Sequence, residues 1–468
     1  MVLMTGEQQK TDTDTASVGY RMGETRTAPK RAEPVSTNDG IEHPAKHGFV
    51  IEQDHLMEEI IEDENRQEAL KRVIRNKGSP GVDDMTVKEL PFYLHEHWLE
   101  LEERLLNGTY KPAPVRQVEI PKPNGGIRKL GIPTVLDRYI QQMVLQVLQR
   151  HIDPTFSDSS FGFRPNRSAH QAIALAQEHI QSGYHWVVDM DLEKFFDRVN
   201  HDVLMSLLAK RIRDKRVLKL IRAFLSSGVM FEGLASPLTE GTPQGGPLSP
   251  LLSNVVLDVL DKELERRGHR FVRYADDCNI YVKSERAGSR VMESITLFLG
   301  KRLKLKVNEQ KSAVGKPSAR KFLGFSFLLR AVVKRRIAPQ SLRKFKSRVR
   351  AITKRNRGWN LEYVIQDLNR YLRGWHGYFG FCETPSVLAK LDGWIRRRLR
   401  SLSWKQWKTP RNRRKELRSR GISGELLKSA SSGKGPWRMG ASPSVNYALP
   451  NGYFRSLGLY ELGFPLLK

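Results

Sequence analysis

Hydrophobic and polar positions along this 468-residue chain follow two different periods. Apolar residues recur every three or four positions over about 49–70, 134–153, 168–181 and 200–226, and again within 241–265 after a Gly/Pro loop, which predicts helices. Two apolar runs around the turn 122–126 predict a β-hairpin within 110–130, and apolar runs at 184–191 and in 303–327 indicate strands. Helices and strands therefore alternate irregularly along the chain.

This irregular order bears on the fold class. Parallel α/β proteins repeat a strand–helix–strand unit, and the chain has no such cycle. An α+β fold with helical additions is therefore expected. Residues 1–45 are polar and almost free of bulky apolar residues, so they are predicted to be disordered. The chain after about residue 330 is predicted to be basic and helical to its end, with Gly/Pro breaks from 432.

The segment Tyr274-Ala275-Asp276-Asp277 carries the most informative chemistry. It lies between the hydrophobic runs 271–273 and 280–282, a pattern that predicts two short strands joined by a tight turn. A turn brings two consecutive carboxylates near one site, whereas within a strand they would face opposite ways. Hard divalent cations such as Mg²⁺ prefer oxygen ligands of this kind. The alternative is an ordinary solvated hairpin.

A second source of carboxylates lies upstream, where the apolar run 186–190 leads to Asp191. Asp189 and Asp191 are two positions apart, so they would share one face of a strand. Asp191 would then join Asp276 in a site for two metal ions, with Asp189 as its rival. Asp197 is interpreted instead as a helix cap.

The loop 241–250, Gly-Thr-Pro-Gln-Gly-Gly-Pro-Leu-Ser-Pro, leads into a predicted helix. Its glycines allow the backbone to approach a ligand closely, and the amide of Gln244 both donates and accepts hydrogen bonds. Gln244 is therefore a candidate contact to a nucleotide. A generic Gly/Pro turn is the alternative.

The net charge of the chain indicates what kind of molecule it binds. The chain has 79 Lys and Arg against 51 Asp and Glu, a net charge of +28, which favours a polyanion. No apolar run is long enough to span a bilayer, and the N-terminus lacks a signal-peptide pattern. The two cysteines, Cys278 and Cys382, form neither a four-ligand zinc site nor a disulfide framework. An intracellular, reduced nucleic-acid protein is expected, with no membrane partner.

The order of these segments resembles the reverse transcriptases, and specifically the reverse transcriptase/maturase proteins encoded by bacterial group II introns. In that family motif A is a strand-borne Asp, here Asp191, motif B is the Pro-Gln-Gly loop, here 243–246, and motif C is Tyr-x-Asp-Asp, here 274–277. Residues 303–312 resemble motif D, and Phe322-Leu323-Gly324-Phe325 resembles the primer-grip motif E. Segments 78–83 and 120–133 resemble the N-terminal extension loop and the fingers motifs.

The resemblance implies a right-hand polymerase fold with fingers, an antiparallel-sheet palm and a helical thumb, plus a basic helical DNA-binding region. The implied domains are a disordered tail at 1–45, an N-terminal extension at 46–108, fingers and palm at 109–328, the thumb or maturase (X) domain at 329–399, and the DNA-binding domain at 400–468. Asp191, Asp276 and Asp277 would be the catalytic carboxylates and would hold two Mg²⁺ ions.

Other family roles transfer to matching positions. Lys122, Arg128 and Gln244 would bind the incoming dNTP. Phe196, five residues after Asp191, would lie beneath the sugar and exclude a 2′-hydroxyl, whereas the adjacent Phe195 is interpreted as core. Phe322, Leu323 and Gly324 would form the primer grip.

The C-terminal half is expected to contact nucleic acid. From 394 to 420 there are twelve Lys or Arg against one acid, Glu416, and tryptophans are interleaved with them, which suits stacking and phosphate contact. The expected contacts are Arg373, Trp375, Arg396, Arg397, Arg398, Trp404, Trp407, Arg411, Arg413 and Arg414. Core packing is the alternative for most aromatic residues here, and His376 is interpreted as structural.

The function implied is an RNA-directed DNA polymerase that copies its intron RNA by target-primed reverse transcription and helps that RNA to splice. Its partners would be the group II intron RNA, target DNA, a template–primer duplex and dNTPs, in the bacterial cytoplasm and on the nucleoid. The chain ends at Lys468 without the cysteines of a zinc-bearing nuclease, so the class C type without that domain is expected. The alternatives are a non-catalytic splicing factor and a related reverse transcriptase of defence or diversification.

Overall fold

The computed structural model describes residues 51, 54–121, 127–231, 234–236, 240–242, 245–429 and 433–463. The tail 1–45, whose disorder was expected, and the predicted nucleotide contacts Lys122 and Gln244 lie outside them. None of the described helices is both long and apolar enough to cross a membrane.

The central element is a four-stranded antiparallel sheet with the strand order β6-β7-β3-β8. Its strands are β3 (Trp186–Met190), β6 (Arg270–Tyr274), β7 (Asp277–Val282) and β8 (Ala313–Gly315). The register pairs Tyr274 with Asp277 across the β6–β7 turn, and Met190 of β3 with Cys278 of β7. The predicted hairpin and buried strand are thus confirmed, and they are neighbours in one sheet.

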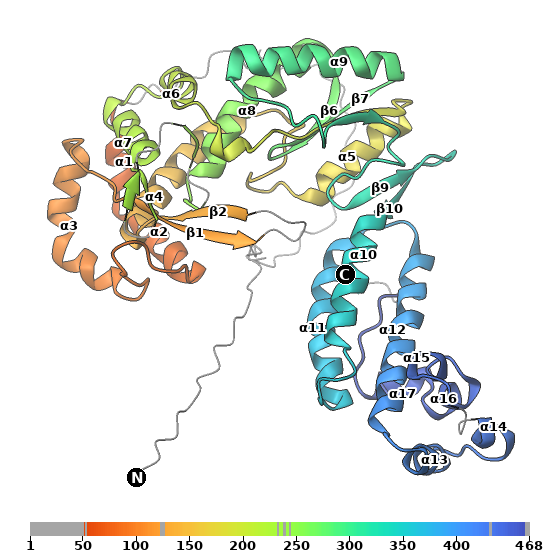
Figure 1. Ribbon diagram of the computed structural model, residues 1–468. Helices are drawn as coiled ribbons and strands as arrows, with labels where there is room; N and C mark the ends of the chain where they lie inside the picture. Colours follow the sequence, from red (N-terminus) through yellow and green to blue (C-terminus); the bar gives the residue numbers. More distant parts are fainter. Residues whose placement is uncertain are drawn as a thin grey trace, which may run out of the picture. The chain divides into compact units, whose positions relative to one another are not determined.

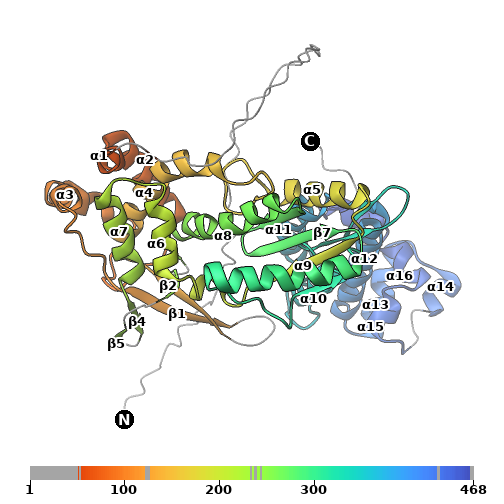
Figure 2. The ribbon, with the colours of Figure 1, turned by 90° about the horizontal axis from the view of Figure 1, so that it is seen from above.

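The two faces of this sheet pack against different helices, as the alternation of side chains along a strand requires. Val188 belongs to a core shared with α8 (Ser249–Arg266) and α9 (Glu285–Phe298). Val187 belongs to a separate core with α5 (Ala169–Gln181). Figure 2 shows α9 lying along the sheet. Asp189 follows Val187 by two positions within β3 and therefore shares its face, whereas Asp191 follows directly after the strand.

A second sheet, β2-β1-β4-β5, contains the predicted hairpin. β1 (Val115–Pro121) and β2 (Ile127–Ile132) are antiparallel, while β4 (Val229–Phe231) runs parallel to β1 and pairs with β5 (Leu234–Ser236). The two short strands β4 and β5 were not predicted. Three residues are too few to show a period of two, so only pairing with a distant strand defines them.

The helices around the two sheets differ from the predictions mainly because two of the predicted helices are each divided into two shorter ones. They are α1 (Leu56–Ile61), α2 (Asp63–Asn76), α3 (Leu90–Leu106), α4 (Val135–Ile152), α6 (His201–Ala209) and α7 (Lys215–Ser226), with short turns η1 (Asp153–Thr155), η2 (Phe195–Asp197) and a π-helical turn η3 (Leu299–Leu303). The helix expected over 49–70 is divided by an extended Glu62. The helix expected over 200–226 is divided where Asp214 accepts from the backbone N–H of Arg216 and caps α7.

The chain after residue 324 begins with a hairpin, β9 (Phe325–Leu328) and β10 (Lys334–Ile337), so the expectation of purely helical structure after 330 is wrong at β10. The helices that follow are α10 (Pro339–Ile352), α11 (Leu361–Phe379), α12 (Pro385–Gln406), α13 (Pro410–Arg418), α14 (Gly424–Ser429), α15 (Pro436–Met439), α16 (Pro443–Ala448) and α17 (Asn451–Ser456) (Figure 1). One hydrophobic core extends from Ile337 to Leu462. The predicted boundary at 399/400 lies inside α12.

Candidate active site

The acidic turn between β6 and β7 forms as the sequence pattern predicts. Ala275 has a φ of 57°, the left-handed conformation that a tight turn needs and that residues with a Cβ adopt at a cost. Asp276 is at the turn and Asp277 begins β7, and both side chains are half-buried. The turn thus directs two carboxylates to the end of the sheet.

Asp191 follows the last residue of the neighbouring strand β3, and its backbone is held by residues 308–312. Its N–H donates to the Ser312 hydroxyl at 2.9 Å, and its carbonyl accepts from the N–H of Asn308 at 2.8 Å. The Lys311 ammonium lies 3.2 Å from the Asp191 carboxylate. The segment that resembles motif D therefore fixes the residue proposed for motif A.

Asp189 has a different environment from its rival. Its carboxylate accepts two hydrogen bonds from the Arg320 guanidinium, at 2.9 and 2.6 Å, and its side chain is only 13% exposed against 34% for Asp191. Asp189 is thus engaged within the protein, whereas Asp191 is the more accessible carboxylate. This distribution of partners favours Asp191 as the functional residue.

The carboxylates influence one another electrostatically. Burial raises the pKa of Asp277 to about 7, and the charges of Asp189 and Asp276 add to the rise. Burial also raises the pKa of Asp276, with Asp191 adding to the effect and Lys311 opposing it. Four acidic side chains from β3 and the β6–β7 turn therefore share one low-dielectric region, where their mutual repulsion favours a bound cation.

Within the described residues, no three His, Cys, Asp or Glu side chains are arranged closely enough to hold a metal ion as they stand. The chemistry of the donors nevertheless fits Mg²⁺, since Asp191, Asp276 and Asp277 supply hard oxygen ligands. The ammonium of Lys311 lies beside Asp191, and Lys321 opposes the rise in the pKa of Asp277. The residues are thus compatible with a divalent cation that displaces or accompanies Lys311.

The Gly/Pro loop contacts the segment that follows Asp191. The N–H of Thr242 donates to the carbonyl of Phe196 at 2.7 Å, and the N–H of Gly241 donates to the carbonyl of Val199 at 2.8 Å. Gly241 has a φ of 90°, and a Cβ there would meet the backbone of Asp197 at 2.9 Å, so glycine is required. Gly241 and Thr242 of this loop therefore lie beside Phe196, the proposed sugar contact.

Phe195 and Phe196 differ in burial as the sequence interpretation expects. Phe195 is 2% exposed and belongs to the core, whereas Phe196 is half-buried and packs against its edge. Their ring centroids are 5.3 Å apart at an angle of 68°. Asp197 lies in a short 3₁₀ turn, and the residue that caps the following helix α6 is Asn200, so the interpretation of Asp197 as that cap is wrong.

The predicted primer-grip residues form a two-residue turn. Leu323 and Gly324 both have positive φ values, 48° and 86°, and Phe322 and Phe325 exchange backbone hydrogen bonds at 2.9 Å. The Tyr378 hydroxyl donates to the carbonyl of Leu323 at 2.8 Å. The side chain of Phe322 is buried and cannot contact a primer. A primer would therefore meet the backbone of this turn, which α11 holds through Tyr378.

The predicted nucleic-acid contacts of the C-terminal half divide into two groups. Trp404 is 0% exposed and Trp375 is 8% exposed within the C-terminal core, so the prediction that these rings stack on nucleic acid is corrected: both pack inside the protein. Trp407 is half-buried. Arg373, Arg411 and Arg414 are exposed.

The remaining predicted arginines are used largely within the protein. Arg396 pairs with Glu461 at 3.1 Å, and the Arg397 guanidinium stacks 4.0 Å from the Trp437 ring. Arg398 donates to the Thr353 hydroxyl at 2.6 Å, and Arg413 stacks on Trp404. Alternation of Arg with apolar residues did not distinguish these internal contacts from solvent-facing ones.

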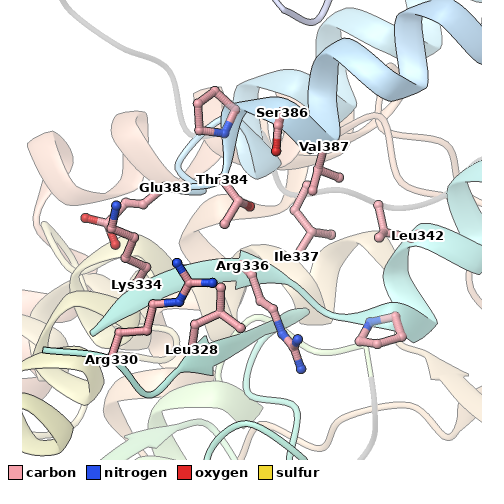
Figure 3. Close-up of a pocket in the computed structure, with 12 residues that line it drawn as sticks. Leu328, Arg330, Lys334, Arg336, Ile337, Leu342, Glu383, Thr384, Ser386 and Val387 are labelled. Atoms are coloured by element: carbon pink, nitrogen blue, oxygen red, sulfur yellow. The ribbon is translucent and has the colours of Figure 1, made fainter. Parts of the chain in front are cut away.

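A cavity of about 540 Å³ lies between the β9–β10 hairpin and the start of α12 (Figure 3). Three cations, Arg330, Lys334 and Arg336, and one acid, Glu383, line it, so its charged lining is positive on balance. None of the four carboxylates contributes to it. This cavity is therefore a cationic hollow distinct from the acidic site.

Three contributions to the acidic site were not predicted: Lys311 on Asp191, Arg320 on Asp189, and the buried Arg273 behind the turn. Lys311 lies in the segment that resembles motif D, which was a usable signal. No sequence signal pointed to Arg320, because its partner Asp189 is 131 positions away. The backbone of the predicted phosphate contact Arg128 lies in β2, opposite Ile120 of β1.

Comparison with known proteins supplies an independent line of evidence. Residues 120–327 match the family described as reverse transcriptase (RNA-dependent DNA polymerase), and residues 342–421 match the group II intron, maturase-specific domain. Protein YkfC of Escherichia coli (strain K12) is 32% identical over 321 residues, which cover 60% of this chain and 83% of YkfC.

Two further proteins are similar over smaller parts. The group II intron-encoded protein LtrA of Lactococcus lactis subsp. cremoris is 30% identical over 330 residues, 56% of this chain and 54% of LtrA, so the chain spans about half of that relative. Among solved structures, a chain of a partial Cas6-RT-Cas1–Cas2 complex has a TM-score of 0.35 at 25% identity, covering 52% of this chain and 42% of that one.

Proposed function

Because this chain belongs to the family of group II intron-encoded reverse transcriptases and maturases, we propose that it copies its intron RNA into DNA and assists the splicing of that RNA. The observation that carries the polymerase part is the convergence of Asp191, Asp276 and Asp277 at one end of the central sheet. Asp191 precedes Asp276 by 85 positions in the sequence, so only the fold brings it to the acidic turn.

In this proposal Asp191, Asp276 and Asp277 hold two Mg²⁺ ions. When bound, such ions lower the pKa of the attacking primer 3′-hydroxyl and neutralise charge on the leaving pyrophosphate. The protein holds the carboxylates in place through Ser312 and Asn308 on one side and the Ala275 turn on the other. Lys311 and Arg320 balance the acidic charge around them.

The dNTP contacts follow the same proposal. Phe196 would face the sugar, because it is half-buried at the core edge and its carbonyl accepts from Thr242 of the loop that carries Gln244. A ring at that position would leave no room for a 2′-hydroxyl. Lys122, which follows β1 in the sequence, and Arg128 of β2 would bind phosphate oxygens.

The right-hand arrangement is also part of the proposal. The sheet β6-β7-β3-β8 would be the palm, the β1–β2 hairpin part of the fingers, and α10–α12 the thumb or X domain. The exposed arginines Arg373, Arg411 and Arg414 and the cationic hollow at Arg330 and Lys334 would contact backbone phosphates of intron RNA, template–primer duplex or target DNA.

Primer extension tests the polymerase part. The full chain, an RNA template with an annealed DNA primer, dNTPs and Mg²⁺ are expected to give cDNA, and the Asp276→Ala/Asp277→Ala variant none. RNA binding by the variant should equal that of the parent, because the substitutions remove no phosphate contact. A folded parent that binds RNA and makes no DNA would leave only a splicing-factor role. Synthesis by the double variant would show that the carboxylates are wrongly assigned.

A further inference from the structure

A buried arginine lies directly behind the acidic turn. Arg273, the fourth residue of β6, is 0% exposed, although an isolated guanidinium in a protein interior is strongly unfavourable. Such a group is tolerated only where its N–H donors are satisfied and its charge is paired. Its surroundings therefore explain why the chain keeps it there.

All five N–H groups of Arg273 are donated. Nε and Nη2 bind the two carboxylate oxygens of Asp261 at 2.7 and 2.5 Å, the bidentate geometry that Arg alone provides. Nη2 also donates to the Ser160 hydroxyl at 2.7 Å. Nη1 donates to the Asn254 side-chain oxygen at 3.0 Å and to the carbonyl of Ala275 at 2.9 Å.

These partners come from three separate parts of the chain. Asp261 and Asn254 are on α8, Ser160 precedes α5, and Ala275 is the left-handed residue of the acidic turn itself. The guanidinium thus links the turn to a helix and a loop that are distant in sequence. Because a left-handed residue with a Cβ is unfavourable, the contact to the Ala275 carbonyl offsets part of that cost.

The same loop supports the turn from a second direction. The N–H of Arg273 donates to the carbonyl of Ser159, and the N–H of Phe161 donates to the carbonyl of Arg273, both at 2.9 Å. Asn254 also donates to the carbonyl of Gly162 at 2.9 Å. A Cβ at Gly162 would collide with the backbone N of Ala275, so loop and turn are packed without spare room.

We propose that Arg273 is a positioning residue, which sets the place of the Asp276 and Asp277 carboxylates by clamping the Ala275 carbonyl to Asp261, Asn254 and Ser160. This inference rests on the proposed polymerase function. A catalytic site that requires its ligands within a fraction of an ångström loses on the order of 10²-fold in rate when they shift by about 1 Å. Arg273 therefore acts through the turn, without touching substrate.

Arg273→Lys keeps the charge but cannot reproduce the five-donor fork. The matched control is Arg211→Lys, which alters another ion pair to α8, between Arg211 and the buried Asp258, with no contact to the turn. In the full chain we would measure melting temperature, template–primer affinity, kcat and KM for dNTPs per folded molecule, and amide hydrogen exchange of the peptide covering 270–282.

For Arg273→Lys we expect kcat to fall about 10²-fold, with KM and template–primer affinity within about twofold and faster exchange at the turn. For Arg211→Lys we expect a lower melting temperature with unchanged kcat and turn exchange. Parent-like kcat and turn exchange in Arg273→Lys would overturn the proposal. An equal loss of kcat in both variants would also overturn it, since the effect would then be general destabilisation.

If Arg273→Lys shows no folding transition, its activity cannot be interpreted, and the variant Ser160→Ala tests the proposal instead. It removes one acceptor of Arg273 and leaves the Asp261 pair, so kcat is expected to fall about fivefold with faster turn exchange. Parent-like values for both quantities would overturn the proposal. An inactive parent would sink the polymerase function, while the exchange comparison would still decide whether Arg273 positions the turn.

Discussion

The acidic end of the central sheet and the basic C-terminal core use charge in opposite ways. At the sheet, like charges of Asp189, Asp191, Asp276 and Asp277 are held together in a half-buried region by a few specific contacts. In the C-terminal core, Arg396, Arg397, Arg398 and Arg413 are paired, hydrogen-bonded or stacked within the protein, as Arg396 is with Glu461. The cluster of like charges at the sheet is typical of a reaction site. The dispersed cations of the C-terminal core are typical of a binding surface supported by internal ion pairs.

The difference has an energetic consequence. Removing one member of a converging catalytic set removes most of the activity, because the members act together. Removing one cation from a dispersed surface changes affinity by a small, roughly additive amount. Removing a buried aromatic residue from the C-terminal core affects folding rather than binding. Variants of each kind distinguish these three cases.

Asp191→Asn is expected to lower DNA synthesis by on the order of 10³-fold or more, because the accessible carboxylate proposed to bind metal is lost. Asp189→Asn is the matched control. It weakens the Arg320 ion pair, so it should lower the melting temperature and reduce synthesis by less than about tenfold. Primer extension with both variants checks this. Equal losses would mean that Asp189 is also part of the reacting set.

Trp404→Ala is expected to reduce the free energy of unfolding by about 3–5 kcal/mol, because the ring is fully buried in the C-terminal core. Trp407→Ala, at a half-buried position, should cost less. Denaturant unfolding measures both. RNA affinity per folded molecule should stay within about twofold for Trp404→Ala. A folded variant that no longer binds RNA would restore the stacking role that burial argues against.

Phe196→Ala is expected to raise the use of rNTPs relative to dNTPs by about 10–100-fold, because it removes the ring proposed to exclude a 2′-hydroxyl. Phe195→Ala should instead destabilise the protein and leave that ratio unchanged, since Phe195 is buried. Single-nucleotide incorporation with matched rNTP and dNTP gives the ratio. A shift of the ratio in Phe195→Ala alone would exchange the two assignments.

Arg373→Ala/Arg411→Ala is expected to weaken RNA binding by a few-fold and to reduce the slope of log affinity against log salt by about 2, one for each phosphate contact. The control Arg396→Ala removes an internal ion pair, so it should lower stability without changing the slope. Salt titrations of RNA affinity make the comparison. An unchanged slope in the double variant would exclude both residues from the interface.

Prediction from sequence succeeded where the signal is local. The β6–β7 turn, strand β3 and helices α4, α5 and α8 follow from hydrophobic period and turn residues that lie within a few positions. It failed for β4, β5 and β10, which are three or four residues long and are defined by their pairing partners. It also failed for Trp404, because the sequence pattern of a tryptophan among arginines is the same whether the ring faces solvent or packs in a core.

The amino-acid order alone was enough to predict the α+β class, the three candidate carboxylates and the family resemblance, because each depends on residue type and order along the chain. The three-dimensional contacts were needed to show that Arg320 pairs with Asp189, that Asp191 is the more accessible carboxylate and pairs with Lys311, and that Arg273 donates to the carbonyl of Ala275 in the acidic turn. Those contacts join residues up to 131 positions apart or depend on complete burial. A buried ion pair depends on the fold that removes both charges from water, and no local sequence pattern indicates which two residues will form it.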